Sequence, residues 1–185
     1  MAESILITGG AASGKARFAV PSFAAFDNVL YLRAGEDLDP DILHRIEFST
    51  RKNNVAWEIV KLVGADPASQ VGEHKFVIFD SISAYTRLVM RELCSGDPDD
   101  PTELTEELKK QVEKKVIVDV LTLRDKIAEK HGSIIIITLE TGFSIRPANP
   151  AMAAYRDILG RVNQRIANSC DEAYFSASGI QFKIR

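Results

Sequence analysis

The sequence has few cysteines and no long apolar run. Two of its 185 residues are cysteines, and Cys94 and Cys170 lie far apart without C-x-x-C spacing, so neither a zinc site nor a disulfide framework is supported. No apolar stretch approaches the roughly 18 residues that cross a bilayer. The first residues, MAES, lead directly into an apolar run without a signal region. We therefore expect a cytoplasmic protein without a membrane span, whose cysteines are buried or partly buried thiols.

No charge of one sign dominates either. The chain has 23 Lys and Arg residues against 26 Asp and Glu residues, a net charge of −3, which gives no electrostatic case for binding nucleic acid. Internal repeats and low-complexity segments are also missing. A hydrophobic content of 45% over this length suits one globular domain with a buried core, spanning residues 1–185.

A glycine-rich motif follows the first apolar run. After ILIT the chain reads GGAASGKA, which matches the phosphate-binding P-loop G-x-x-x-x-G-K-[ST] except at its last position. In this motif backbone N–H groups cradle phosphate oxygens, the lysine contacts the β- and γ-phosphates, and the final hydroxyl coordinates Mg²⁺. Here Lys15 is retained as a binding and catalytic residue, whereas Ala16 has no hydroxyl, so one protein ligand to the metal is missing. The expected nucleotide-binding loop consists of Gly9, Gly10, Ala11, Ala12, Ser13, Gly14, Lys15 and Ala16. The alternative is a glycine-rich turn that binds nothing.

Short apolar runs alternate with helical patterns along the rest of the chain. After the first strand, further strands are expected at residues 28–32, 57–63, 75–79, 133–138, 172–176 and 181–184. Helices are expected at 39–51, 83–93 and 151–168, and from a cap at Thr102 or Thr105 to about residue 130. This alternation predicts the α/β class, with a doubly wound, mostly parallel sheet and helices on both faces. The last two strands, at 172–176 and 181–184, are joined by a turn at 177–179, and an antiparallel pairing of these two strands is an alternative.

The ends of the predicted strands mark the place for a ligand, because open parallel sheets bind ligands beyond the carboxyl ends of their strands. This rule selects the P-loop, residues 33–36, Asp80 with Ser81, and residues 140–142. An acid at the end of an apolar strand in a P-loop protein commonly holds Mg²⁺ directly or through water, so Asp80 is the expected metal and catalytic residue. Its alternative role is to cap the following helix. Glu140 is a second carboxylate, with a loop acid as its alternative.

The run YRDILGRVNQR at residues 155–165 closely resembles the bifunctional adenosylcobinamide kinase/adenosylcobinamide-phosphate guanylyltransferase family of cobalamin biosynthesis. Further segments fall in the family's order: ILITGGAASGK, residues 28–32, Arg45-Ile46, Trp57, residues 138–142, Asp171-Glu172 and Ser178-Gly179-Ile180. The resemblance therefore covers nearly the whole chain. Taken alone, the run is a basic helix face with Arg161 and Arg165 four residues apart, which a solvated or subunit-contacting surface would also explain.

The resemblance implies a RecA-like P-loop fold, a homotrimer and two successive reactions. Members of this family phosphorylate the aminopropanol hydroxyl of adenosylcobinamide with a nucleoside triphosphate, ATP or GTP, with Mg²⁺ as the expected cofactor. They then transfer GMP from GTP to that phosphate through a guanylylated histidine, which gives adenosylcobinamide-GDP. The first reaction needs positioning and charge neutralisation. The second needs a nucleophilic imidazole.

The nucleophile is one of the positions at which this chain departs from the family. The family's histidine falls two or three residues after the Arg45-Ile46 pair, where this chain has Phe48 and Ser49, so neither register supplies an imidazole. His44 is an alternative nucleophile, but its side chain starts a full helical turn of about 5.4 Å from Phe48. The sequence therefore predicts that guanylyl transfer is impaired.

Other departures bear on the nucleotide and the metal. The family's loop reads GGARSGKS, with an arginine and a serine where this chain has Ala12 and Ala16. A family threonine after the second strand is Ala34, beside Gly35, and a glutamate after the tryptophan is Lys61. The strand-end glutamate is shortened to Asp80. We include Ala34, Gly35 and Lys61 among the expected nucleotide-binding residues.

Two functions remain open from the sequence. The first is a nucleoside-triphosphate-dependent kinase of the adenosylcobinamide type, since Lys15, the loop backbone and Asp80 remain and Mg²⁺ readily keeps water in place of protein ligands. The second is a homologue that binds nucleotide or corrinoid without turnover, in a regulatory or assembly role. Lys61 bears on the choice, because a cation beside the phosphates would replace lost charge in an active enzyme, whereas a solvated lysine would not.

Overall fold

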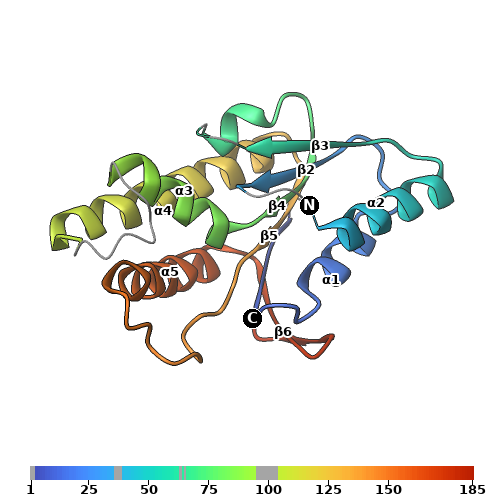
Figure 1. Ribbon diagram of the computed structural model, residues 1–185. Coiled ribbons are helices and arrows are strands. Elements are labelled where there is room, and N and C mark those ends of the chain that lie inside the picture. The colour runs from blue at the N-terminus through green and yellow to red at the C-terminus, as the bar shows by residue number, and fades with distance from the viewer. Residues whose placement is uncertain (1–2, 36–38, 63, 65, 95–103) are drawn as a thin grey trace.

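The computed structural model describes residues 3–35, 39–62, 64, 66–94 and 104–185, and they form one seven-stranded sheet with helices on both faces (Figure 1). The strands are β1 (Glu3–Gly9), β2 (Val29–Ala34), β3 (Trp57–Leu62), β4 (Phe76–Asp80), β5 (Ser133–Ile137), β6 (Glu172–Ala177) and β7 (Ile180–Lys183). Their order is β3-β2-β4-β5-β1-β6-β7. Every neighbouring pair is parallel except β6 and β7, which are antiparallel. The expected mostly parallel α/β sheet is confirmed.

Two apolar layers hold the helices to the sheet. The helices are α1 (Lys15–Ser22), α2 (Pro40–Asn53), α3 (Ile82–Leu93), α4 (Glu106–Glu129) and α5 (Pro150–Ser169), with a short 3-10 helix at Pro67–Gln70. Successive side chains of a strand point to opposite faces. Tyr31 and Ile78 accordingly pack with α1 and α2 on one face, while Leu32 and Phe79 pack with α3, α4 and α5 on the other.

Side chains cap the first turns of α2, α3, α4 and α5, and the sequence predicts the cap at Thr105. Asp39 accepts a hydrogen bond from the backbone N–H of Asp41 at the start of α2, and Thr105 accepts one from Leu108 at the start of α4. Thr102, the other predicted cap of α4, and Val63, the predicted end of β3, lie outside the described residues. At α3 the cap is Ser81, whose Oγ accepts from the N–H of Ala84 at 3.3 Å. Asp80 therefore does not cap this helix.

Strands β2 and β4, which border the cavity described below, end later than the sequence predicts. Strand β2 continues through Arg33 to Ala34, because Arg33 pairs in register with Lys61 of β3 and with Asp80 of β4. Asp80 is likewise the last residue of β4 and does not follow it. Because side chains alternate between the two faces along a strand, Arg33 and Asp80 lie on the face that carries α1 and α2, and Ala34 lies on the opposite face.

Two further predictions from the composition concern the state of the cysteines and the presence of membrane-spanning helices. Cys170 is buried and Cys94 partly exposed, and both are free thiols as predicted. Across the described ranges, no helix combines the length and apolar character that a bilayer crossing requires.

Candidate functional site

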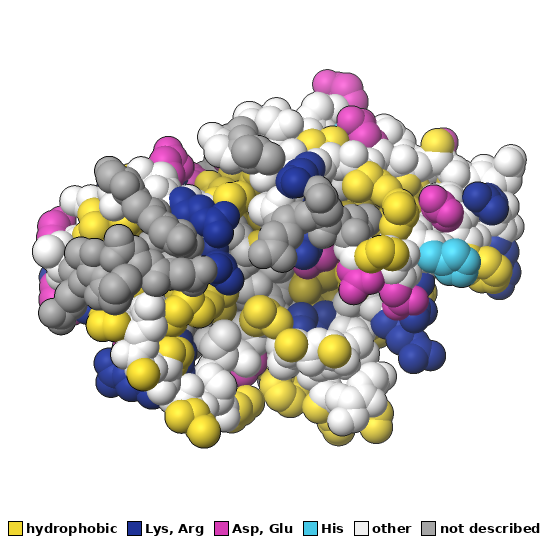
Figure 2. All heavy atoms as spheres, in the orientation of Figure 1, with side chains coloured by type: hydrophobic (Ala, Val, Ile, Leu, Met, Phe, Trp, Pro, Cys, Tyr) yellow, Lys and Arg dark blue, Asp and Glu magenta, His cyan; other side chains and the backbone are white. Residues whose placement is uncertain are grey.

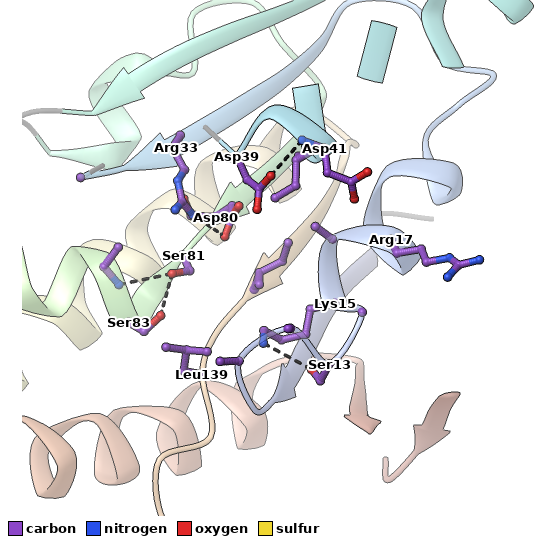
Figure 3. Close-up of a pocket in the computed structure, with 18 of the residues that line it drawn as sticks. Ser13, Lys15, Arg17, Arg33, Asp39, Asp41, Asp80, Ser81, Ser83 and Leu139 are labelled. Atoms are coloured by element: carbon purple, nitrogen blue, oxygen red, sulfur yellow. Dashed lines mark hydrogen bonds and ion pairs between the residues drawn. The ribbon is translucent and has the colours of Figure 1, made fainter. Parts of the chain in front are cut away.

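An open cavity of about 740 Å³ lies beyond the carboxyl ends of the central parallel strands. Its walls come from segments far apart in the sequence: the P-loop with the start of α1, the end of β2, the start of α2, one face of α3, the segment after β5, and the turn between β6 and β7. Figure 3 shows Lys15 and Ser13 on one side of this hollow and Arg33, Asp80 and Ser81 on another. The cavity lies where the parallel-sheet rule placed the ligand.

The P-loop is shaped by two glycines and supported by the β6–β7 turn. Gly9 has φ +154°, and a Cβ there would lie 2.3 Å from the carbonyl oxygen of Ser176. Gly14 has φ +98°, and a Cβ there would lie 3.0 Å from the Cα of Gly179. The carbonyl of Ser13 accepts hydrogen bonds from the Gly179 N–H and the Ser176 hydroxyl, both at 2.9 Å. Close packing on the turn therefore requires glycine at both positions.

Lys15 lies against its own loop and is 9% exposed. Its ammonium donates hydrogen bonds to the carbonyls of Gly9 at 3.1 Å and Gly10 at 2.5 Å, and to the hydroxyl of Ser13 at 3.4 Å. Burial lowers the pKa of Lys15, and the negative charge of Asp80 partly opposes this. The pair therefore places a cation and an anion within electrostatic reach of each other in the cavity.

Asp80 is 5% exposed, and both of its carboxylate oxygens have a partner in the protein, one through a hydrogen bond and one through an ion pair. The hydroxyl of Tyr31 donates to Oδ2 at 2.6 Å, and Nη1 of Arg33 lies 2.9 Å from Oδ1. Burial, and then the charge and hydrogen bond of Asp80, raise the pKa of the Tyr31 hydroxyl. Tyr31 therefore stays a neutral donor that orients the carboxylate. Arg33 neutralises the negative charge of the Asp80 carboxylate.

The residues present do not fit a protein-held Mg²⁺, the metal that a P-loop implies. Ala16 offers no hydroxyl, and Asp80 is paired with Arg33. The other acids of the lining are engaged as well, since Asp39 caps α2 and Asp41 pairs with Arg45 at 2.9 Å. Among the residues that the structure describes, no three His, Cys, Asp or Glu side chains gather as metal ligands. Asp80 was predicted as a metal ligand, and the geometry instead makes it the partner of an arginine.

Three residues at the ends of β2 and β3 were predicted to contact nucleotide, and one of them reaches the cavity. Gly35 lines it. Ala34 is fully buried in the core on the opposite face of the sheet, so its prediction is corrected. Lys61 is exposed on the edge strand β3 and is not part of the lining, so its contact with nucleotide stays a prediction. Arg33, the register partner of Lys61, does line the cavity.

Helix α2 separates the two positions at which the family histidine could fall. Asp41, Ile42 and Arg45 face the cavity, and Ser49 continues this face because it lies four residues after Arg45. Phe48, 63% exposed, lines a different and shallower pocket. His44 lines that second pocket as well, together with Glu47, Arg51 and Lys52. Ser49 is therefore the position from which an imidazole would approach the cavity.

The predicted basic run on α5 fixes the wall after β5. The buried Asn163 accepts a hydrogen bond from the Thr138 hydroxyl at 2.8 Å and donates to the carbonyl of Leu139 at 2.9 Å. The Tyr155 hydroxyl donates to the carbonyl of Ser83 at 3.1 Å. Leu139 and Tyr155 line the cavity, so this run positions a wall of the site.

The charged residues near the same wall play other roles. Arg161 forms an ion pair with Glu113 of α4 at 2.6 Å, outside the cavity. Arg165 is exposed and is not part of the lining either. Glu140 accepts a hydrogen bond from the Gly142 N–H at 2.7 Å and does not line the cavity, so it is the loop acid of the alternative interpretation.

Sequence reasoning missed most of the basic side chains around the cavity. Its described lining has six Lys and Arg residues and three carboxylates, although the whole chain is net negative. These are Lys15, Arg17, Arg33, Arg45, Arg87 and Arg91 against Asp39, Asp41 and Asp80. Figure 2 shows Lys and Arg side chains gathered over α3. The spacing of Ser83, Arg87 and Arg91 along one helix face after Asp80 was a signal that could have identified them.

Comparisons with known proteins agree with this architecture. An ATPase from the type III secretion system of pathogenic bacteria has a similar fold, with a TM-score of 0.55 and 14% identity over 94% of this chain and 50% of that chain. That likeness shows a P-loop fold.

Proteins with similar sequences identify the family as well as the fold. Two proteins named bifunctional adenosylcobalamin biosynthesis protein CobU are similar to it: 28% identical in Escherichia coli K12 and 29% in Salmonella typhimurium LT2, each over 98% of this chain and 99% of theirs. CobP of Pseudomonas aeruginosa is 25% identical over 97% of this chain and 96% of its own. The family model CobU, cobinamide kinase/cobinamide phosphate guanyltransferase, matches residues 5–184. Because that match spans the P-loop, every wall of the cavity and the β6–β7 turn, the chain belongs to the cobinamide kinase/cobinamide phosphate guanyltransferase family.

Proposed function

We propose that this protein binds a nucleoside triphosphate, ATP or GTP, in the P-loop and transfers its terminal phosphate to the aminopropanol hydroxyl of adenosylcobinamide. The observation that carries this proposal is the convergence of Lys15, Arg33 and Asp80 at the strand ends of a cavity rich in cations. Phosphoryl transfer depends mainly on positioning and on neutralising charge, and these residues supply both. We place the whole described sheet in one nucleotide-binding unit.

The roles of the residues follow from their positions. The loop N–H groups from Gly9 to Ala16 would hold the β- and γ-phosphates, and Lys15 would move from its loop carbonyls to a phosphate oxygen. Asp80, fixed by Tyr31 and Arg33, would orient the attacking hydroxyl by accepting its hydrogen bond. The wall of Leu139 and Tyr155 would exclude water from the acceptor.

Guanylyl transfer is proposed to be lost. A guanylylated intermediate needs an imidazole nitrogen at the α-phosphate, and Ser49 supplies only a hydroxyl on the helix face that lines the cavity. His44 lies with Phe48 in the second pocket and is not a replacement. His74 is held by the carbonyl of Asn28 and by Glu58, near the start of β2 and β3 and away from the strand ends.

The test is a transfer assay with adenosylcobinamide and ATP or GTP labelled on the γ-phosphate. We expect labelled adenosylcobinamide phosphate from the wild type, and at least a tenfold lower rate from Lys15→Ala. Arg165→Ala removes a cation outside the cavity and is the matched control, with an unchanged rate. A wild type that binds nucleotide but forms no product would refute kinase activity.

A second function, binding of nucleotide or corrinoid without turnover in a regulatory or assembly role, has one observation in its favour. Asp80 is already neutralised by Arg33, and Ala16 cannot hold a metal, so the usual metal-assisted route lacks its ligands. Calorimetry together with the transfer assay separates the two functions: binding without product supports this one. From the family resemblance we further propose a homotrimer in the cytoplasm, which sedimentation and cell fractionation would test.

A further inference from the structure

We propose that Arg33 supplies the positive charge that P-loop enzymes usually obtain from Mg²⁺, so that this chain binds the terminal phosphates of a nucleoside triphosphate without a divalent metal. This inference rests on the proposed function, because it needs a nucleotide in the P-loop. It concerns one side chain at the end of β2, and its ligand is the phosphate end of the nucleotide.

The register of the sheet puts Arg33 at the phosphate site. Arg33 of β2 lies opposite Asp80 of β4, and strand parity directs both side chains to the face that carries the P-loop and α1. Nη1 lies 2.9 Å from Oδ1 of Asp80 and also donates to the Asp80 carbonyl at 3.4 Å. Figure 3 shows Arg33 and Asp80 across the hollow from Lys15. The two cations therefore flank one carboxylate.

The guanidinium keeps donors for a further partner. Its side chain is 21% exposed, and both its ion pair with the Asp80 carboxylate and its hydrogen bond to the Asp80 carbonyl use Nη1. Nε is buried and has no hydrogen-bond partner in the part of the chain that the structure describes. A buried donor without an acceptor is unfavourable, and a phosphate oxygen would provide one. The planar fork of a guanidinium matches phosphate geometry, so the ion pair with Asp80 presents Arg33 in a ready orientation.

The same geometry disfavours Mg²⁺ at this position. A metal held through Asp80 would have to share that carboxylate with Arg33, whose charge repels it. The hydroxyl that would compensate is missing at Ala16. The sequence suggested Lys61 as the replacement cation, and Lys61 lies outside the lining while its register partner Arg33 lies within it.

Removal of the Arg33 side chain should change how nucleotide binding depends on Mg²⁺. Removal of the guanidinium leaves Asp80 as an unpaired carboxylate in the cavity, free to accept a hydrated Mg²⁺. An Arg33→Gln variant should therefore bind nucleotide weakly without metal and should regain affinity when Mg²⁺ is added. The affinity of the wild type for nucleotide should not change when Mg²⁺ is added. A residue with a merely structural role would not reverse the metal dependence.

The experiment is calorimetry of the full chain with a non-hydrolysable ATP analogue, in EDTA and in millimolar Mg²⁺. For the wild type we expect dissociation constants that agree within threefold. For Arg33→Gln we expect at least a tenfold weaker affinity in EDTA and a gain of at least tenfold from Mg²⁺. Arg165→Gln removes the same charge from an exposed position outside the lining and is the matched control, with less than a threefold change.

Each outcome decides one of the two proposals. A wild type that binds at least tenfold more tightly with Mg²⁺ overturns the role of Arg33 and leaves nucleotide binding intact. A wild type that binds in neither condition overturns the proposed function. An Arg33→Gln variant that behaves like Arg165→Gln also overturns the inference. Should Arg33→Gln fail to fold, Asp80→Asn serves instead: metal-free affinity that is retained or tightened supports the inference, and a tenfold loss of affinity in Mg²⁺ refutes it.

Discussion

Substitution of Asn163 tests whether the run on α5 acts by holding the wall after β5. The Asn163 amide is 6% exposed, and it accepts from the Thr138 hydroxyl and donates to the Leu139 carbonyl. Asn163→Ala would remove both hydrogen bonds and leave two polar groups without these partners. Each buried group that loses its partner costs about 1–3 kcal/mol. The Leu139 carbonyl is only partly buried and can be rehydrated, so we expect a total loss of about 2–3 kcal/mol.

Urea unfolding followed by circular dichroism gives the measurement. With a slope of about 2 kcal/mol per molar urea, this loss lowers the midpoint by about 1–1.5 M. Gln164→Ala changes the neighbouring exposed residue of the same helix and is the matched control, with an expected change within about 0.5 kcal/mol. If both variants unfold at the same midpoint, the hydrogen bonds of Asn163 do not stabilise the wall and the reasoning is refuted.

Three further predictions follow from the site and its surroundings. Lys15→Ala should weaken triphosphate binding at least tenfold, about 1.4 kcal/mol, and calorimetry that finds equal affinities would contradict its role. GTP labelled on its α-phosphate should leave no acid-labile GMP adduct on the wild type; Ser49→His should form one, whereas Phe48→His, which faces the second pocket, should not. Ser4 donates hydrogen bonds to Asp171 and lowers its pKa below 3.8, so the carboxylate stabilises the fold above that pH and loses this effect as the pH falls. Asp171→Asn should therefore flatten the decline of the free energy of unfolding below about pH 4; parallel urea curves for both proteins would count against it.

The P-loop and the position of the cavity could be predicted because their signals are local. GGAASGK is a contiguous motif, and the strand-end rule orders Gly35 and Asp80 around it without knowledge of the sheet order. The contacts of Asp80 could not be predicted. Its partners Tyr31 and Arg33 are on another strand, and their positions depend on a register that no local pattern contains.

The correction at Ala34 also depends on strand pairing. The sequence indicated a strand that stops at Leu32, so the residues after it were expected to line the site as a loop. Because pairing extends β2 to Ala34, side chains alternate through this segment, and Ala34 turns into the core while Arg33 reaches the cavity. A shift of two residues in the end of this strand therefore decides which of its side chains lines the cavity.

The support of the P-loop by the β6–β7 turn has a consequence for how the chain is made. Gly14 is synthesised before Gly179, on which it packs, and more than 160 positions separate the two. Until then the loop lacks the hydrogen bonds that Gly179 and Ser176 donate to Ser13. The P-loop is therefore synthesised well before the residues that complete its hydrogen bonds. Ligand binding at the loop should slow hydrogen exchange in the distant hairpin, because the two can only be ordered together.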